Sequence, residues 1–400
     1  MSYGVNSIQI HKKLRLDKRA GSDNWYARLT LPNGKRLVKT TKTEDIESAK
    51  EVALRLYYEV DARIQNKLPA TTRKFGDVAK HAINRMETEI REGVGKQAYR
   101  DYVQALNKWL IPYFGGTDIA KLDLAAVTAF DAWRTAQSGK VPAQSTINNH
   151  NSALNRVLDE AELNGWIVKS LRPTLLNKGV KTQSRGSFSV EEYRVIYTAL
   201  RTFHKNTPNE KSAATRETLR NYVLFLANTG VRHGTEALGL RWRNIEWYER
   251  DGERYLAINV DGKTNKRTAI ARDSVENSLW RQARLNPRIR AVSDFDGLVA
   301  AKLDEPVFTT RLSDTVTVHN LNRAFNALLD GLDLKTGADG RTRTLYSLRH
   351  FYATLNLERG VTTHALSRQL GNSTVMIDRH YSKYSPLLNA EVHSGRKKKP

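Results

Sequence analysis

Hydrophobic and polar residues alternate in two short stretches near the N-terminus, residues 25–31 and 36–41. Residues 32–35 between them read Pro-Asn-Gly-Lys, and Asn-Gly between alternating runs is a strong hairpin signal. From residue 43 onward the apolar residues follow the helical period, and one face is predicted to carry Ala49, Val52, Ala53, Leu56 and Val60. The pattern therefore predicts a small antiparallel sheet with one helix over residues 1–68.

A helical period returns over residues 75–168, after an aperiodic stretch at residues 66–74 in which Pro69 would stop a helix. Breaks at Pro112, at residues 115–116 and at residues 138–142 divide this region into about four helices. A second irregular and basic stretch at residues 170–185 is typical of a linker that crosses a polyanion. We therefore expect a helical bundle between two linkers.

The last predicted domain, residues 186–400, mixes helices with a sheet. Ser189 and Glu192 have the spacing of a capping box at a helix start. Residues 255–260 and 267–270 are expected to form a hairpin around residues 261–266, and the remainder to about residue 370 is mainly helical. The predicted fold class is a mainly α multidomain protein with a small N-terminal sheet domain and a mixed α+β C-terminal domain.

Composition favours a nucleic-acid partner and excludes thiol chemistry, although a ribosomal or membrane-surface protein can be equally basic. The 400 residues include 65 Lys and Arg against 42 Asp and Glu, for a formal net charge of +23, which favours a polyanionic partner. The absence of cysteine excludes disulfides, thiolate catalysis and cysteine-ligated zinc. No apolar run approaches the ~18 residues that span a bilayer, and residues 1–10 lack a signal-peptide core. We expect a cytoplasmic protein without a membrane partner.

Three segments combine basic residues with a tyrosine. Residues 228–242 contain Thr-Gly-Val-Arg-His around Arg232, and residues 346–354 begin Tyr-Ser-Leu-Arg-His around Arg349. Residues 370–384 begin Leu-Gly-Asn, and Tyr381 follows Asn372 by nine residues. In order and spacing these three boxes closely resemble the tyrosine recombinase family of phage integrases.

The resemblance implies a site-specific DNA recombinase that cuts and rejoins DNA through a 3′-phosphotyrosyl bond. Tyr381 would be the nucleophile, and Tyr384, three residues on, is the rival position. Such chemistry needs no metal, nucleotide or other cofactor, and the sequence contains no Walker-type phosphate loop and no acidic metal cluster.

Arginine and lysine suit the remaining chemistry of phosphodiester transfer. Arg232 and Arg349 are the predicted clamp, because a guanidinium donates in a fork that matches two phosphate oxygens. Arg232 is also expected at a helix entrance where backbone N–H groups face an anion. In the family a hairpin lysine protonates the leaving oxygen; Lys263 is preferred here and Lys266 is its rival.

Two positions depart from the commonest family pattern. Tyr346 and Asn372 stand where histidines are usual. Tyrosine is a poor general base near neutral pH and asparagine cannot move a proton, so both are expected to act by hydrogen bonding. His350 either compensates or packs behind the site, and Glu236, one helical turn after Arg232, is expected to orient that arginine or the hairpin by a hydrogen bond.

The family organisation also predicts how the domains meet DNA. Residues 1–68 would read arm-type sites. Residues 1–74, which include the following linker, contain 16 Lys and Arg against 8 Asp and Glu and so carry a net positive charge. Residues 75–168 would bind core-type sites, and residues 186–400 would be catalytic. The candidate DNA contacts are Lys35, Arg36, Lys39, Lys140 and Asn149, with His150 and Arg156 also suitable. Solvated polar surface is the alternative for each of them.

Recombination would bring four protomers together on double-stranded DNA in a bacterial host cell, with a DNA-bending protein and a directionality factor as further partners. Two other functions remain open from the sequence. One is a DNA-binding architectural or regulatory protein with a decayed catalytic site. The other is a chromosome-dimer resolvase or type IB topoisomerase-like enzyme, although a resolvase normally lacks the N-terminal sheet domain.

Overall fold

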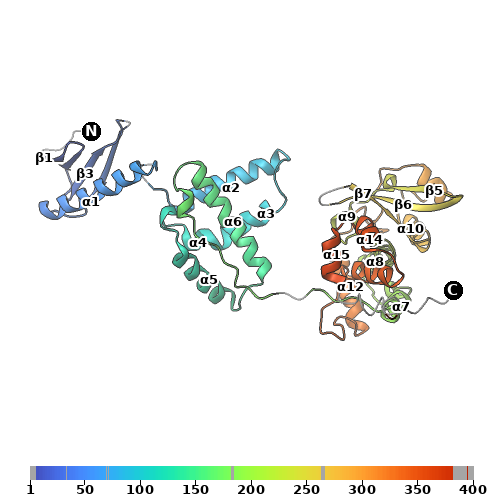
Figure 1. Ribbon diagram of the computed structural model, residues 1–400. Coiled ribbons are helices and arrows are strands. Elements are labelled where there is room, and N and C mark those ends of the chain that lie inside the picture. The colour runs from blue at the N-terminus through green and yellow to red at the C-terminus, as the bar shows by residue number, and fades with distance from the viewer. Residues whose placement is uncertain are drawn as a thin grey trace. The chain divides into compact units, whose positions relative to one another are not determined.

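The computed structural model describes residues 6–32, 34–68, 70, 72–181, 184–262, 266–381 and 394. The chain divides into two compact units, residues 1–182 and 183–400. It is mainly helical, with one antiparallel sheet in the described part of each unit, as the sequence predicts (Figure 1).

The N-terminal sheet has four strands in the order β1-β2-β3-β4, and one helix packs against it. Its elements are β1 (Ser7–His11), β2 (Leu14–Lys18), β3 (Trp25–Thr30), β4 (Arg36–Thr40) and α1 (Ile46–Gln65). Strands β3 and β4 are the predicted hairpin, whereas β1 and β2 are additional. Leu14, Leu16, Ala27 and Leu29 are buried against Ala49, Ala53, Leu56 and Val60. Val52, predicted for the buried face of α1, is 37% exposed because it lies at the edge of the apolar stripe.

The rest of the first unit is a helical bundle with its own core. Its elements are α2 (Phe75–Arg91), α3 (Tyr99–Ala105), a π-helical turn (Leu106–Leu110), α4 (Ile111–Phe114), α5 (Leu124–Ser138) and α6 (Gln144–Leu163), with single 3₁₀ turns at Ile119–Lys121 and Lys169–Leu171. The predicted break at Pro112 is wrong. Pro112 lies in the first turn of α4, where its missing N–H is tolerated, and the π-helical turn before it keeps the helix continuous.

Much of the predicted second linker is attached to the bundle. The amide nitrogen of Asn177 donates to the Gln144 carbonyl at 2.8 Å and to Asn148 Oδ1 at 2.6 Å. Arg172 Nη1 lies 2.7 Å from Asp159 Oδ1 on α6. The segment is irregular, as predicted, but its side chains and backbone follow α6.

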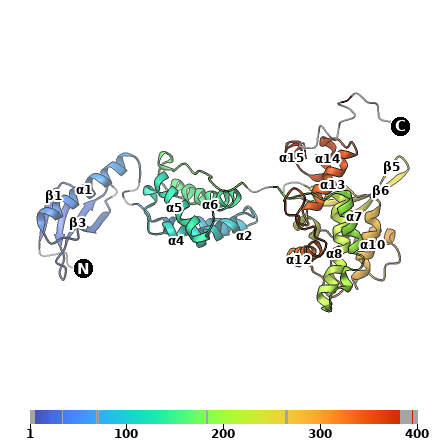
Figure 2. The same cartoon turned by 90° about the horizontal axis from the view of Figure 1, so that it is seen from below.

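The second unit is built around α8, which contacts α7, α10, α12 and α13 (Figure 2). Its elements are α7 (Val190–Ala199), α8 (Glu210–Thr229), α9 (Thr235–Leu238), β5 (Ile245–Arg250), β6 (Glu253–Asp261), β7 (Lys266–Ile270), α10 (Ser274–Leu285), α11 (Phe295–Ala300), α12 (Val318–Gly331), α13 (Ser347–Glu358), α14 (Thr363–Leu370) and α15 (Thr374–Tyr381), with single 3₁₀ turns at Phe203–Lys205 and Trp242–Asn244. The predicted hairpin is β6 and β7, and β5 extends it to three strands. The capping box of Ser189 and Glu192 is present at the start of α7.

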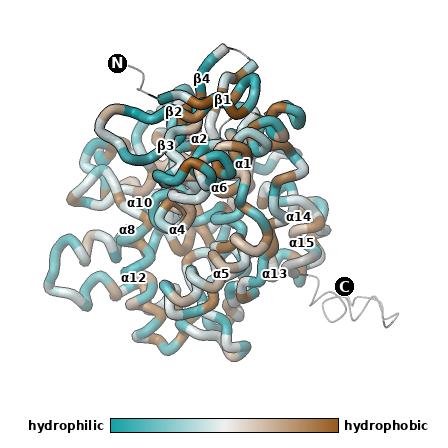
Figure 3. The backbone as a smooth tube through the Cα atoms, turned by 90° about the vertical axis from the view of Figure 1, so that its left-hand side faces the viewer, coloured by the Kyte–Doolittle hydropathy of each residue, from teal (hydrophilic) through white to brown (hydrophobic). Residues whose placement is uncertain are grey.

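Hydrophilic and hydrophobic residues are mixed along the helices (Figure 3). Within the described ranges, none of the helices combines the length and the apolar character that a membrane crossing requires.

Candidate active site

The first box begins where α8 ends. Gly230 caps this helix in the left-handed conformation, with φ of 69°. A Cβ at this position would lie 2.5 Å from Leu370 Cδ2 and 2.6 Å from Tyr352 Cδ1. Only glycine therefore allows the end of α8 to approach α13 and α14 this closely. Arg232 follows two residues later, in the turn before α9.

The carboxylate of Glu236 accepts two hydrogen bonds from Arg232. The backbone N–H of Arg232 donates to Glu236 Oε2 at 3.0 Å, and the Arg232 guanidinium donates to Glu236 Oε1. The orienting contact predicted for Glu236 is thus present in the structure. The predicted anion-facing helix entrance is wrong, because this N–H is already bonded to Glu236 and α9 spans only Thr235–Leu238.

Arg349, on α13, contacts the turn that follows α8 through the backbone oxygen of Gly230. Its side chain is buried, and its two terminal nitrogens donate to the backbone oxygens of Gly230 and Leu370, each at 2.6 Å. Burial, with the nearby charge of Arg232, lowers the pKa of Arg349. The sequence predicts that Arg349 clamps a phosphate. In the structure its two terminal nitrogens contact backbone oxygens of the first and third boxes.

The third box closes the arrangement. Gly371 ends α14 with φ of 63°, and its carbonyl accepts a hydrogen bond from Arg232 Nη2 at 2.8 Å. The same nitrogen donates to the side-chain oxygen of Asn372. Residues of all three boxes therefore meet at the turn of residues 370–372.

Tyr346 and His350 lie at the start of α13. Both are half-buried, and their rings meet edge to face with centroids 5.3 Å apart. The guanidinium of Arg185 lies 5.3 Å from the centre of the Tyr346 ring. Arg185 was predicted only as a basic linker residue, so its position here is new.

The predicted acid falls in the hairpin between β6 and β7. Lys263 lies outside the described residues. Lys266, the rival, begins β7; its side chain is 90% exposed and its ammonium lies 3.7 Å from Asp261 Oδ1.

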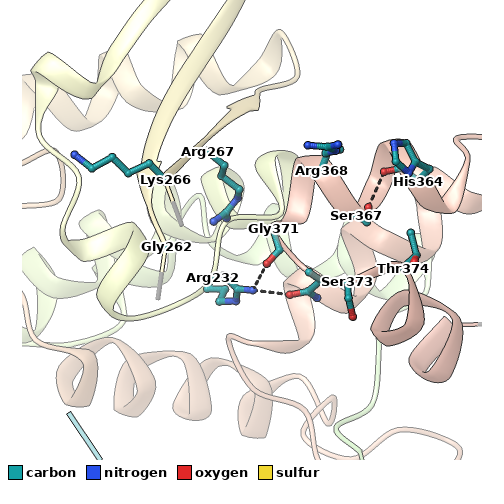
Figure 4. A pocket seen from close by; sticks show the side chains of 11 residues that line it. Arg232, Gly262, Lys266, Arg267, His364, Ser367, Arg368, Gly371, Ser373 and Thr374 are labelled. Atoms are coloured by element: carbon teal, nitrogen blue, oxygen red, sulfur yellow. Dashed lines mark hydrogen bonds between the residues drawn. The ribbon is translucent and has the colours of Figure 1, made fainter. Parts of the chain in front are cut away.

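These elements surround an open cleft of about 600 Å³ (Figure 4). Its described lining residues are Arg232, Gly262, Lys266, Arg267, His364, Ser367, Arg368, Gly371, Asn372, Ser373 and Thr374. This lining is cationic and includes no Asp or Glu, so the cleft suits an anionic group such as a phosphodiester. In the part of the chain that the structure describes, no group of three or more His, Asp or Glu residues is arranged to hold a metal ion.

The helix that carries the predicted nucleophile follows the third box directly. Ile377 on α15 is buried against Leu366 and Leu370 of α14, which fixes one face of α15. Tyr381 is the last residue of α15. Tyr384 lies outside the described residues.

Sequence reasoning missed two residues of this region. Arg267 on β7 pairs with Glu236 and lines the cleft. His233 contacts the Tyr222 hydroxyl through Nδ1 at 2.9 Å, and burial together with the charge of Arg185 lowers its pKa to about 4. The adjacent Arg-His pair in the first box was visible in the sequence, whereas nothing separated Arg267 from other strand arginines.

The candidate DNA contacts differ in exposure and do not share one face of the N-terminal sheet. Lys35, Arg36, Lys39 and Lys140 are exposed, and Asn149 is half-buried. Arg36 pairs with Thr30 and Lys39 with Ala27 in neighbouring strands, so strand alternation puts them on opposite faces of the sheet. His150 is an unsuitable DNA contact, since it is buried in the bundle with Nδ1 at 3.2 Å from Arg134 Nη1. Arg156 lies 3.6 Å from Glu89 Oε1.

Known proteins share this fold and part of this sequence. No protein-family model matches the chain. A tyrosine recombinase XerC-like protein from Caldanaerobacter subterraneus subsp. tengcongensis is 26% identical over 269 residues, or 60% of this chain. The chain spans 62% of the length of that curated relative.

Two solved integrases are similar over most of their length. A lambda integrase dimer bound to a COC′ core site matches with a TM-score of 0.54 and 17% identity, covering 92% of this chain and 94% of that one. The Tn1549 transposon integrase in complex with circular intermediate DNA matches with a TM-score of 0.54 and 15% identity, covering 78% and 95%. The resemblance predicted from the three boxes is thereby confirmed: the chain has the integrase fold and is related in sequence to a tyrosine recombinase.

Proposed function

We propose that this chain is a site-specific DNA recombinase, a phage or genomic-island integrase that cuts and rejoins DNA through a 3′-phosphotyrosyl intermediate. The observation that supports this most directly is the meeting of the three boxes at residues 370–372 beside a cationic cleft. These boxes are far apart in the sequence, and ordinary packing does not require two arginines to converge on one turn.

In the proposed reaction the Tyr381 hydroxyl loses its proton to solvent and its oxygen attacks a DNA phosphorus. A bond forms between them, and the bond from phosphorus to the 5′ oxygen breaks. Arg232 contacts a non-bridging phosphate oxygen, and the charge of Arg349 beneath the turn stabilises the negative charge that develops there. Tyr346 and Asn372 contribute hydrogen bonds. The freed 5′ hydroxyl of the partner strand later attacks the phosphotyrosine and restores the DNA.

The leaving 5′ oxygen needs a proton. We assign this step to a lysine of the β6–β7 hairpin, with Lys263 preferred and Lys266 as its rival. Cationic neighbours such as Arg267 favour proton release from an ammonium group. His350, packed against Tyr346, is assigned a supporting role.

Double-stranded DNA is the proposed partner. Residues 1–68 would bind arm-type sites, residues 75–168 core-type sites, and residues 186–400 would catalyse. The exposed Lys35, Arg36, Lys39 and Lys140 and the half-buried Asn149 are the candidate contacts. One matched structure is a lambda integrase tetramer bound to a Holliday junction. By analogy we propose a homotetramer on DNA in the host cytoplasm, assisted by a DNA-bending protein and a directionality factor.

Covalent trapping on a nicked duplex tests this function. A nick close to the cleavage site makes the fragment that carries the freed 5′ hydroxyl short, so it diffuses away. The cleavage then cannot reverse, and the protein remains joined to DNA. We expect a complex that survives denaturing electrophoresis and disappears after proteolysis. Duplex binding without any covalent product, on duplexes that carry the element's own attachment sites, would favour the DNA-binding protein with a decayed site.

A resolvase or a topoisomerase-like enzyme would also be trapped, so a second measurement separates them. An integrase requires arm-type sites to recombine two DNA molecules. Relaxation of supercoiled DNA without such sites, at the full rate, would favour the topoisomerase-like enzyme. Recombination of two core-type sites alone would favour the resolvase.

A further inference from the structure

Arg267 forms a forked ion pair with Glu236 at the loop end of the β6–β7 hairpin, where Arg267 lies opposite Val260. Arg267 Nη1 lies 3.1 Å from Glu236 Oε1, and Nη2 lies 2.7 Å from Oε2. The side chains are 9% and 4% exposed, so the pair is shielded from water. Burial alone would raise the pKa of Glu236, but hydrogen bonds from Arg267 and from the Arg232 backbone lower it to about 2. Glu236 is therefore ionised at neutral pH.

The same carboxylate holds Arg232. Glu236 accepts from the backbone and the guanidinium of Arg232 as well as from Arg267. One buried acid thus joins the hairpin to the arginine that faces the cleft. A planar fork of this kind fixes orientation as well as distance.

Arg267 is also anchored to the third box. Its Nε donates to the Gln369 carbonyl at 3.2 Å. The Gln369 side chain in turn accepts from Ile270 N at 3.0 Å and donates to Ile270 O at 2.8 Å, which fastens β7 to α14. A Cβ on Gly371 would lie 2.8 Å from Arg267 Cδ, so the backbone of the third box packs directly on this side chain.

Arg267 follows Lys266 in β7, and both line the same cleft with Gly262 on the other side of the hairpin (Figure 4). We propose that Arg267 is a positioning residue for the general acid, holding the loop end of the hairpin against the Arg232 site through Glu236. This inference rests on the proposed recombinase function. It gives a reason for a buried ion pair so close to the loop that carries the candidate acids.

The proposal predicts which chemical step fails when Arg267 changes. The bond from phosphorus to the 5′ oxygen breaks easily only if that oxygen receives a proton, and a misplaced acid donates poorly. A 5′ sulfur in place of that oxygen leaves as a thiolate, since a thiol is far more acidic than an alcohol. A sulfur-bridged substrate therefore bypasses the acid but still needs the tyrosine and the phosphate contacts.

The experiment measures single-turnover cleavage by the full chain on nicked duplexes with oxygen or sulfur at the 5′ bridging position. For Arg267→Gln and Arg267→Lys we expect cleavage of the oxygen substrate to fall by about 10²–10⁴-fold, the usual contribution of a general acid. On the sulfur substrate both variants should come within about tenfold of the parent. Lys263→Ala and Lys266→Ala calibrate the rescue, because one of them removes the acid itself.

Arg368→Gln is the matched control. Arg368 is an exposed cation that lines the same cleft from α14. Any loss in this variant reflects cleft charge, and sulfur should not restore it. Arg267 variants that cleave the oxygen substrate normally, or whose defect sulfur leaves unchanged, would overturn the inference.

The variants must also be shown to fold. Arg267→Lys keeps the charge opposite Glu236, and duplex affinity equal to the parent's demonstrates an intact structure. A variant that binds the duplex as the parent does and is rescued by sulfur supports positioning of the acid. If the parent itself cleaves neither substrate, the proposed function fails; if the parent cleaves both and the Arg267 variants are not rescued, only this inference fails.

Discussion

The guanidinium of Arg349 donates a hydrogen bond of 2.6 Å to the backbone oxygen of Gly230, which joins the second box to the first. Its other terminal nitrogen reaches the Leu370 oxygen at the same distance. Arg349 therefore fixes the two backbone turns that place Arg232 and Asn372. Its charge, close to those of Arg232 and Arg267, also adds to the positive potential under the cleft.

Arg349→Lys should lower both stability and activity. A lysine keeps the charge and has three N–H donors, but it is shorter and lacks the planar fork that reaches both carbonyls, so we expect one buried oxygen to lose its partner. Losing a buried hydrogen bond to a charged group costs about 1.5–3 kcal/mol. Denaturant unfolding should show this loss, and single-turnover cleavage should fall by more than about 10²-fold. Unchanged stability with lost cleavage would mean that Arg349 acts on the phosphate alone.

Asn372→Ala should impair cleavage with little effect on duplex affinity. The asparagine oxygen accepts a hydrogen bond from Arg232, and the alanine leaves that guanidinium less constrained. The alanine also removes the amide N–H donor proposed for the phosphate, and losing one donor at an oxyanion-type site costs about 10²–10³-fold in rate. Asn372→His, which retains an acceptor and restores the commoner residue, should stay within about tenfold of the parent. Full cleavage by the alanine variant would contradict this role.

The sequence predicted the parts of the fold whose patterns are local. The Asn-Gly signal predicted a hairpin, and β3 and β4 pair as expected, although Asn33 itself lies outside the described residues. The Ser189–Glu192 capping box is also a short signal, and it is present. Pro112 misled the helix boundary because the π-helical turn that accommodates it has no sequence signature. His150 read as a surface polar residue because its partner Arg134 lies on another helix.

The candidate site was predicted from motifs, and its supporting contacts were not. The boxes located Arg232, Arg349 and Asn372. In the structure Arg232 contacts Asn372, and Arg349 contacts backbone oxygens of the first and third boxes. Arg267 could not be found this way, since its pairing with Glu236 depends on how β7 packs against α9 and α14. The catalytic roles of all these residues stay predictions.

Gly230→Ala should lower the free energy of unfolding of the second unit by more than a glycine-to-alanine change at a left-handed position normally does. Its φ is 69°, and an added Cβ would meet Leu370 Cδ2 at 2.5 Å. Gly252→Ala is the control: its φ is 79°, but nothing lies within 4 Å. We expect about 1–2 kcal/mol for the control and at least 1–3 kcal/mol more for Gly230→Ala from overpacking. Equal losses in denaturant unfolding would refute the close approach of α8 and α14.

Acid should weaken the helical bundle through His150. Burial, with the charge of Arg134, lowers the pKa of His150 to about 4. The unfolded chain, with an ordinary histidine pKa near 6.5, binds the proton first, so this stability is complete above about pH 6.5 and is lost as pH falls toward 4. The loss amounts to roughly 3 kcal/mol at most.

His150→Gln removes this titration, so the stability difference between parent and variant should shrink steadily from pH 7 to pH 4. Denaturant unfolding of the bundle, followed by hydrogen exchange in α5 and α6, measures it. A constant difference across that range would show that His150 is not held neutral by the fold.

The most direct test of the whole account is covalent trapping of Tyr381→Phe and Tyr384→Phe beside the parent on the nicked duplex. The account predicts that Tyr381→Phe forms no covalent complex while it binds the duplex as the parent does, because only the attacking hydroxyl is lost. Tyr384→Phe should still be trapped. Trapping that persists in Tyr381→Phe and vanishes in Tyr384→Phe would contradict the assignment and move the nucleophile to Tyr384.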